Sequence, residues 1–156
     1  MSIHESDLVQ GLSGPEVEEL SALASHRSMS EGTVLFRLGE EADGVFVVEK
    51  GRVNLTLPVR LGENQGDIPV EERLPNQLLG WSGLIPPYVY TLQAVAAEDS
   101  ELLFLPRDGL LELFSGKPEM GYRVVANLAA TVGDRLQLFQ TMWVREMQRS
   151  IGKRSA

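Results

Sequence analysis

After a polar start, the chain begins with the pattern of one short helix. Apolar residues recur at helical spacing between positions 17 and 24. Ser13 stands three residues before Glu16, which is the arrangement of a capping box at a helix start. This pattern predicts a helix that begins after Ser13 and ends before Ser28.

From about residue 27 to residue 106, short apolar runs alternate with turn residues. The runs lie at 33–38, 45–48, 53–59, 92–95 and 102–105. Pairs such as Asp43-Gly44 and Lys50-Gly51 stand between them, with glycine where a tight turn needs a positive φ. The polar stretch 61–66 is typical of a hairpin tip. Short strands at this spacing predict a barrel or a sandwich.

Helical periodicity returns after residue 106. Asp108 can cap a helix that Gly116 closes, and Pro118 can open a last helix that runs to about Gln148. We therefore expect an N-terminal tail at 1–11, a body at 12–117, a long helix at 118–148 and a loose tail at 149–156.

The last helix carries an apolar stripe that is longer than the body it follows. Thirty residues span about 45 Å, whereas a body of about 100 residues has a radius of gyration near 13 Å. An uncovered apolar stripe indicates an interface, and a two-fold dimer is the simplest form of one. The alternative is a kink after Gly133 that folds the helix back. The candidate dimer residues are Leu128, Val132, Leu136, Phe139, Trp143 and Met147.

Composition removes several classes of partner and chemistry. The chain has 156 residues, of which 43% are hydrophobic, and a formal net charge of −8. This acidity argues against nucleic acid and anionic membranes as partners. The chain has no cysteine, which excludes disulfides and thiol chemistry. Neither a signal peptide nor a membrane span is visible, so we expect a cytoplasmic protein.

One stretch of the chain resembles a known family. Residues 32–53 contain a glycine, a strand, Gly39-Glu40, Asp43, an apolar strand and Gly51-Arg52-Val53. This order resembles the first half of a cyclic nucleotide-binding domain, and the resemblance extends over residues 12–136. It implies a mainly β fold with helices: an eight-stranded β-roll of the jelly-roll kind, with an N-terminal helix and long C-terminal helices.

The resemblance breaks down where the family binds its ligand. Gly80 to Thr91 aligns with the phosphate-binding cassette, in which a glutamate is implied to bind the ribose and an arginine the cyclic phosphate. Trp81 and Tyr88 stand at these positions, and losing both charged contacts weakens phosphate binding by several powers of ten. Backbone N–H groups around residues 82–84 offer a weaker anion cradle. The candidate ligand residues are Gly80, Trp81, Ser82, Gly83, Leu84, Tyr88, Tyr90, Thr91 and Arg123.

Three interpretations of this loop stay open: Trp81 plugs the pocket, the pocket takes another small ligand, or it still takes a cyclic nucleotide. We favour a non-enzymatic small-molecule sensor or protein-interaction module that does not bind cyclic AMP in the usual way. No cofactor is expected beyond such a ligand. The alternative is a genuine receptor for cyclic AMP or cyclic GMP, in which Arg123 supplies the missing charge and the last helix transmits the signal.

Other candidate chemistry is weak. The two histidines, His4 and His26, have no second ligand at metal spacing, and the acidic clusters sit at turns and helix starts. We therefore predict neither a catalytic nor a metal site. Basic residues near the C-terminus are typical of a helix end, where positive charge is favourable. A nucleic-acid-binding arm is the less favoured interpretation. Only eight residues follow the predicted helix, too few for a helix-turn-helix reader of DNA.

Overall fold

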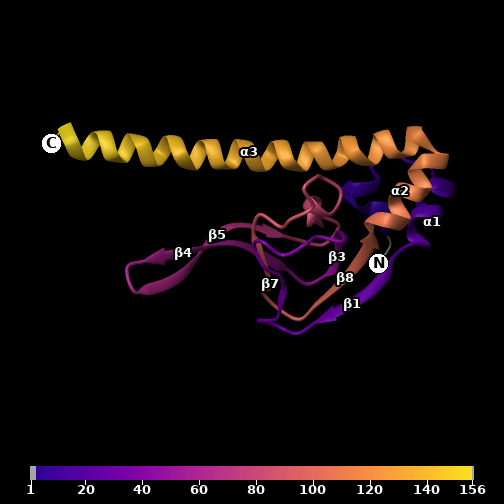
Figure 1. Cartoon of the computed structure of the whole chain (residues 1–156), viewed down its shortest axis with the longest axis horizontal. Coiled ribbons are helices and arrows are strands. Elements are labelled where there is room, and N and C mark those ends of the chain that lie inside the picture. The colour runs from indigo at the N-terminus through magenta and orange to yellow at the C-terminus, as the bar shows by residue number, and fades with distance from the viewer. Residues whose placement is uncertain (1–2, 156) are drawn as a thin grey trace.

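The structure, a computed structural model, describes residues 3–155 and consists of a two-sheet roll beside one long helix (Figure 1). The sheets have the strand orders β1-β8-β3-β6 and β2-β7-β4-β5, and every pairing is antiparallel. The strands are β1 Ser25–Met29, β2 Val34–Phe36, β3 Gly44–Lys50, β4 Val53–Leu61, β5 Asn64–Arg73, β6 Leu78–Leu79, β7 Gln93–Ala96 and β8 Ser100–Pro106. The predicted mainly β roll with flanking helices is confirmed.

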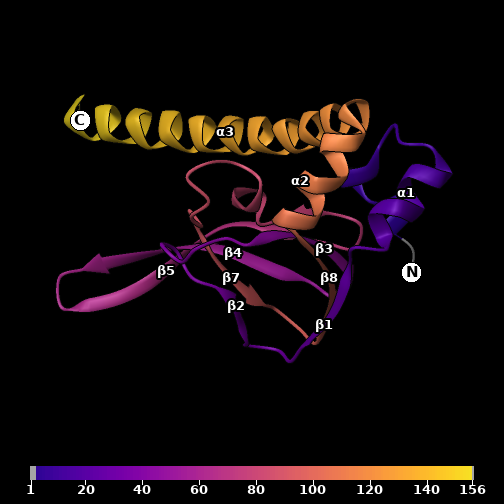
Figure 2. The same ribbon diagram turned by 45° about the vertical axis from the view of Figure 1, so that its right-hand side comes forward.

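The hydrophobic pattern did not predict three of these strands, β1, β5 and β6, and each omission has a physical reason. β1 is an edge strand whose residues are mostly exposed, so it has no apolar face to reveal it. β5 pairs with β4 in a hairpin whose outer part lies beyond the roll, and most of its residues are exposed and polar (Figure 2). β6 is buried but has only two residues, Leu78 and Leu79.

Two apolar clusters hold the fold together. One lies between the sheets and includes Phe36, Phe46 and Leu102. The other joins the roll to the helices and includes Leu8 and Leu128. Burial of such side chains contributes about 1.5–3 kcal/mol each, so the helices are part of the same cooperative unit as the roll.

The N-terminal segment packs against the body rather than forming a tail. Two 3-10 turns, η1 Ile3–Glu5 and η2 Asp7–Val9, bury three apolar side chains in the core. Residues 1 and 2 of the expected tail lie outside the described residues. The helix α1 Gly14–Ser21 follows, and Ser13 forms the predicted capping box with Glu16.

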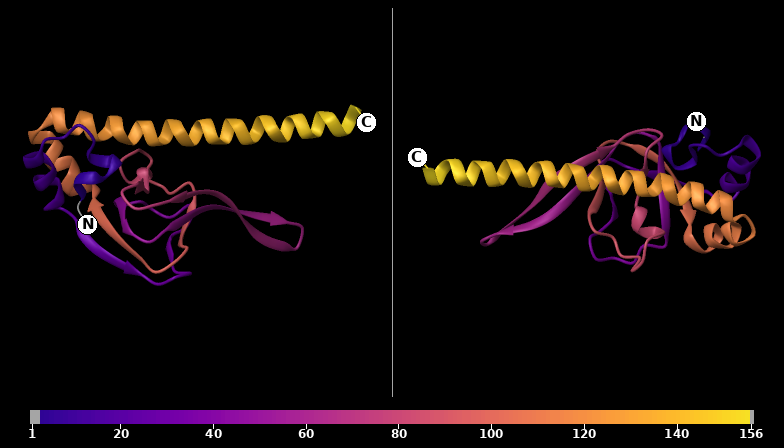
Figure 3. Two further views of the ribbon diagram at one scale, coloured as in Figure 1. Left: turned by 180° about the vertical axis from the view of Figure 1, so that it is seen from behind. Right: turned by 90° about the horizontal axis from the view of Figure 1, so that it is seen from above.

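The C-terminal helices are α2 Arg107–Gly116 and α3 Pro118–Ser155. The 38 residues of α3 span about 57 Å. The helix is straight and extends beyond the roll in the same direction as the β4–β5 hairpin (Figure 3). The alternative kink after Gly133 is therefore wrong. The helix also continues through residues 149–155, where we expected a loose tail; residue 156 lies outside the described residues.

The expected dimer stripe divides into two parts along α3. Leu128 is fully buried in the core of its own chain, so a second copy cannot contact it in this arrangement. Val132 and Phe139 are partly covered by the roll. Leu136 and Trp143 remain 58% and 66% exposed, and Met147 is exposed as well.

Candidate functional site

The loop between β6 and β7 is built on glycines that admit no side chain. Gly80 has a φ of 73°, in the left-handed region that favours glycine. It begins the single 3-10 turn η3 Trp81–Gly83. A Cβ on Gly83 would collide with the Gly44 carbonyl group, so η3 can lie directly on the start of β3 only because residue 83 is glycine.

Two of the three amide groups that were candidates for an anion cradle are already used within this turn. The N–H of Gly83 donates to the Gly80 carbonyl oxygen at 3.0 Å, and the N–H of Leu84 donates to the Trp81 carbonyl oxygen at 3.0 Å. Ser82, Gly83 and Leu84 are all buried. The turn therefore offers few of its donors to a ligand in this conformation.

Arg107, the first residue of α2, contacts the loop at Gly83 and at Tyr88. Its Nη1 donates to the carbonyl oxygens of Ala42 and of Gly83, the latter at 3.2 Å. Its guanidinium also lies 4.0 Å from the centre of the Tyr88 ring. Tyr88 has a φ of 60° and faces this arginine. The tyrosine at the position of the family's arginine thus has a structural contact of its own.

The cavity at the centre of the loop is almost filled by side chains. The rings of Phe36 and Tyr90 stack with centroids 3.7 Å apart and an angle of 7° between their planes. The remaining space is about 10 Å³. Its lining consists of Phe36, Leu55, Gly80, Trp81, Ser82, Tyr90, Thr91, Leu92 and Arg135. Burial raises the pKa of Tyr90 to about 12, which keeps its hydroxyl neutral.

A larger groove lies next to this cavity on the α3 side, and Trp81, Thr91, Leu92 and Arg135 line both. The groove has a volume of about 290 Å³ and is lined by Leu57, Trp81, Thr91, Leu92, Val132, Arg135, Leu136 and Phe139. Trp81 is half-buried, and the Arg135 guanidinium lies 6.0 Å from its ring centre. Within residues 3–155, the buried Trp81 Nε1 has no hydrogen-bond partner.

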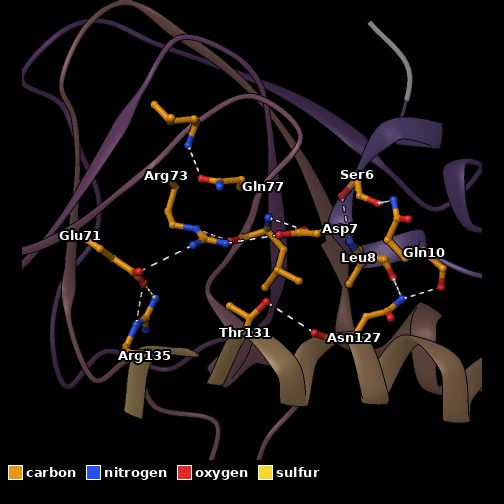
Figure 4. A network of polar contacts seen from close by, with 12 residues as sticks. Ser6, Asp7, Leu8, Gln10, Glu71, Arg73, Gln77, Asn127, Thr131 and Arg135 are labelled. Carbon is orange, nitrogen blue, oxygen red and sulfur yellow. Dashed lines mark hydrogen bonds and ion pairs between the residues drawn. The ribbon is translucent and has the colours of Figure 1, made fainter. Parts of the chain in front are cut away.

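Arg135 belongs to a chain of ion pairs that joins α3 to β5 and to the N-terminal segment (Figure 4). Its Nε donates to Glu71 Oε1 at 2.8 Å, and its Nη2 contacts the same oxygen. Glu71 Oε2 also lies 3.7 Å from Arg73 Nη1, and Arg73 Nη2 lies 3.4 Å from Asp7 Oδ2. A carboxylate thus sits between two buried guanidinium groups.

Backbone contacts fix the other end of this chain. Arg73 Nε donates to the Leu78 carbonyl oxygen, and the Leu78 N–H donates to Asp7 Oδ1, both at 2.8 Å. Burial lowers the pKa of Arg73, although Glu71 and Asp7 oppose the shift. Burial raises the pKa of Asp7 despite its hydrogen bonds and the nearby Arg73. Desolvation therefore outweighs the pairing at Asp7.

The sequence did not point to Arg135, and it placed Arg123 near the ligand. In the structure, the Arg123 side chain packs beside Gly11 and does not line the cavity or the groove. Arg135 lies seven residues after the buried Leu128, so it shares that face of α3. The signal in the sequence that could have identified Arg135 is a charged residue on the face of the last helix that also carries buried apolar residues.

No constellation for metal chemistry replaces the missing charged contacts. Within the described part of the chain, no three His, Cys, Asp or Glu side chains gather closely enough to hold a metal ion. His26 lies on the exposed strand β1, with its Nε2 2.9 Å from Glu101 Oε2.

None of the helices between residues 3 and 155 combines the length and apolar character needed to cross a membrane.

Comparison with known proteins agrees with this fold. Residues 26–117 match the family described as "Cyclic nucleotide-binding domain". The "Cyclic AMP receptor protein" of Thermus thermophilus is 30% identical over 132 residues, which are 85% of this chain and 58% of that relative. The chain therefore spans little more than half of that protein's length.

Two solved structures resemble the chain in three dimensions. The catabolite activator protein of Thermus thermophilus superposes with a TM-score of 0.73 and 28% identity, over 91% of this chain and 63% of the other. A cyclic nucleotide-binding domain from Methylobacillus flagellatus superposes with a TM-score of 0.71 and 20% identity, over 97% of this chain and 83% of the other. The second likeness concerns the fold alone.

Proposed function

The chain belongs to the cyclic nucleotide-binding domain family, and from this premise we propose that it is a non-enzymatic sensor or protein-interaction module that does not bind cyclic AMP in the usual way. The observation that carries the proposal is the small free volume of the cavity, about 10 Å³. Pockets for small organic ligands have volumes of about 300–1,000 Å³. Entry of a nucleotide would require the stacked rings of Phe36 and Tyr90 to part.

The charge of the cavity supports the same conclusion. Of the nine residues that line it, Arg135 alone is charged, and Glu71 neutralises it. A cyclic phosphate would have to compete with that carboxylate or bring an unpaired negative charge into a buried site. An unpaired buried charge is strongly unfavourable.

We also propose that the chain forms a homodimer through the distal half of α3. The exposed apolar side chains there are Leu136, Trp143, Val144, Met147 and Ile151. An apolar stripe of this kind on a helix that leaves its own body fits the same helix of a second copy. The interface excludes Leu128, which the roll already covers.

Calorimetry with cyclic AMP and cyclic GMP tests the ligand part of the proposal. We expect no saturable heat up to a ligand concentration of about 1 mM, which corresponds to binding weaker than about −4 kcal/mol. Micromolar binding of either nucleotide would instead establish a genuine receptor with rearranged contacts.

Sedimentation equilibrium tests the dimer. The variant Trp143→Glu places a charge on the exposed stripe, and we expect it to have the mass of one chain where the wild type has the mass of two. Leu61→Glu is the matched control, because Leu61 is 71% exposed at the end of β4 and lies off the helix. A wild type that stays monomeric, or a Trp143→Glu variant that stays dimeric, would contradict this interface.

A further inference from the structure

The roll carries a further concavity on the side opposite α3, where β1 and β3 end and β8 begins (Figure 1). Residues 28–30, Lys50 and residues 99–101 line it, and none of them lines the cavity or the groove beside α3. Its volume of about 300 Å³ is at the lower end of the range for small-molecule pockets. The concavity is therefore large enough to hold a small organic ligand.

Hydrogen bonds between the surrounding turns fix the shape of this concavity. Ser100 is buried, and its Oγ accepts from the Arg52 N–H at 3.1 Å and donates to the Glu98 carbonyl oxygen at 2.8 Å. Asp99 Oδ1 accepts from the Glu31 N–H at 2.9 Å, which joins the turn before β8 to the turn after β1. A site that is already held in place loses less conformational entropy when a ligand binds.

The charged groups of the concavity carry both signs and leave contacts unused. Glu101 Oε2 accepts a hydrogen bond from Ser28 Oγ at 2.8 Å and lies 2.9 Å from His26 Nε2. Within residues 3–155, Glu101 Oε1 and Asp99 Oδ2 accept no hydrogen bond, and the Lys50 ammonium forms no ion pair. Lys50 and Glu101 lie opposite each other on β3 and β8, yet their side chains do not pair. The concavity thus presents one ammonium group and two carboxylate oxygens to a ligand.

This pattern of charges selects a class of ligand. An anion would contact Lys50 but lie beside the carboxylates of Asp99 and Glu101, and a cation would contact those carboxylates but lie beside the Lys50 ammonium. A molecule that carries both an ammonium and a carboxylate group can place each charge against its opposite. Met29 is the apolar residue of the lining and offers a contact for a hydrocarbon side chain.

We infer that this concavity binds a free amino acid in its zwitterionic form. The ammonium group of the ligand lies at Asp99 and Glu101, its carboxylate lies at Lys50, and its side chain lies against Met29. The inference goes beyond the proposed function, because it assigns a second site that depends neither on the cavity beside α3 nor on the dimer.

Three related molecules test the two charges separately, by two-dimensional NMR of the ¹⁵N-labelled wild type. L-leucine carries both charges, 3-methylbutylamine lacks the carboxylate, and 4-methylpentanoate lacks the ammonium group, while all three share a branched hydrocarbon chain. We expect L-leucine to shift the amide signals of residues 28–30, 50 and 99–101 saturably, with a Kd of about 1 mM or tighter. Each of the other two molecules should bind at least about fivefold more weakly, because it lacks one charge contact at a partly exposed site.

Matched substitutions assign each charge to a residue. Lys50→Gln should abolish the advantage of L-leucine over 3-methylbutylamine, because the ligand carboxylate loses its positive partner. Asp99→Asn keeps an acceptor for the Glu31 N–H and should reduce the advantage of L-leucine over 4-methylpentanoate. Lys117→Gln is the control: it removes the same charge from an exposed lysine that pairs with Glu19 outside the concavity, and it should leave the Kd of L-leucine unchanged. The spectra of the variants also show whether the fold is kept.

Several results would overturn the inference. These are absence of saturable shifts up to about 10 mM L-leucine, equal binding of all three molecules, or equal effects of Lys50→Gln and Lys117→Gln. Shifts confined to residues 80–91 would place the amino acid beside α3 and would also contradict the inference. The calorimetry with cyclic nucleotides and the mass of Trp143→Glu concern other surfaces, so failure here is distinguishable from failure of the proposed function.

Discussion

Replacing Glu71 by glutamine tests the ion-pair chain that holds α3 to the roll. The Glu71 carboxylate lies between Arg135, at 2.8 Å from Nε, and Arg73, at 3.7 Å from Nη1. The two arginine side chains are only 9% and 10% exposed. Glutamine has nearly the same shape, so Glu71→Gln removes the charge and leaves the packing in place.

The expected loss of stability follows from this burial. Removing one partner of a buried ion pair costs about 3–5 kcal/mol, because the other charge is left uncompensated. Glutamine keeps one acceptor oxygen, and Asp7 still lies 3.4 Å from Arg73, so we expect the lower end, about 3 kcal/mol. Urea unfolding followed by circular dichroism should show a midpoint lower by about 1–3 M.

The neighbouring residue supplies the control. Glu72 follows Glu71 on β5, and its side chain pairs with Arg52 at 2.8 Å. That pair is 51% and 39% exposed, so Glu72→Gln should cost less than about 1 kcal/mol. Equal losses for the two variants, or a loss below about 1 kcal/mol for Glu71→Gln, would refute the view that the buried pair fastens α3.

Three further predictions concern single residues. Because burial raises the pKa of Tyr90 to about 12 from the model-compound value of 10.0, the native state keeps this proton while the unfolded state loses it. Wild-type stability should therefore fall between pH 10 and pH 12 relative to Tyr90→Phe by about 2 kcal/mol; a pH-independent difference in urea midpoints would contradict this. Gly133→Ala should stabilise the protein by about 1 kcal/mol in thermal unfolding, since its Cβ would meet nothing within 4 Å on a continuous helix; a loss of stability would contradict a straight α3. Arg107→Ala should speed amide hydrogen exchange in residues 81–90, because it removes the contacts with Gly83 and Tyr88, and Arg107→Lys should not restore the stacking; unchanged exchange would count against this anchoring role.

The parts of the fold that the sequence predicted are those in which one face meets the core. β3 and β8 alternate or bury apolar residues, and α1 carries both a stripe and a capping box. β1 and most of β5 lack such a face, so only their backbone pairing with β8 and β4 makes them strands. The N-terminal 3-10 turns were missed because three buried residues are too few to show a period.

The sequence drew attention to one loop but did not reveal the contacts that fill it. The sequence located the loop from Gly80 to Thr91 and its lack of charge. It did not show that Phe36, from a distant strand, stacks on Tyr90, because ring contacts between strands depend on register. It pointed to Arg123, early in the last helix, and did not point to Arg135, because only docking of that helix determines which arginine faces β5.

The charges around the site support the proposal that this fold does not bind its family's ligand in the usual way. The two charged positions that the resemblance implies hold Trp81 and Tyr88 instead, and Tyr88 is engaged by Arg107. The charge that does line the cavity, on Arg135, is matched by Glu71 of the same chain. The site is thus balanced internally, and an anion entering it gains no partner that a carboxylate has not already taken. The same pair that discourages a phosphate also holds α3 on the roll, so restoring anion binding at Arg135 would require giving up a contact on which the position of the helix depends.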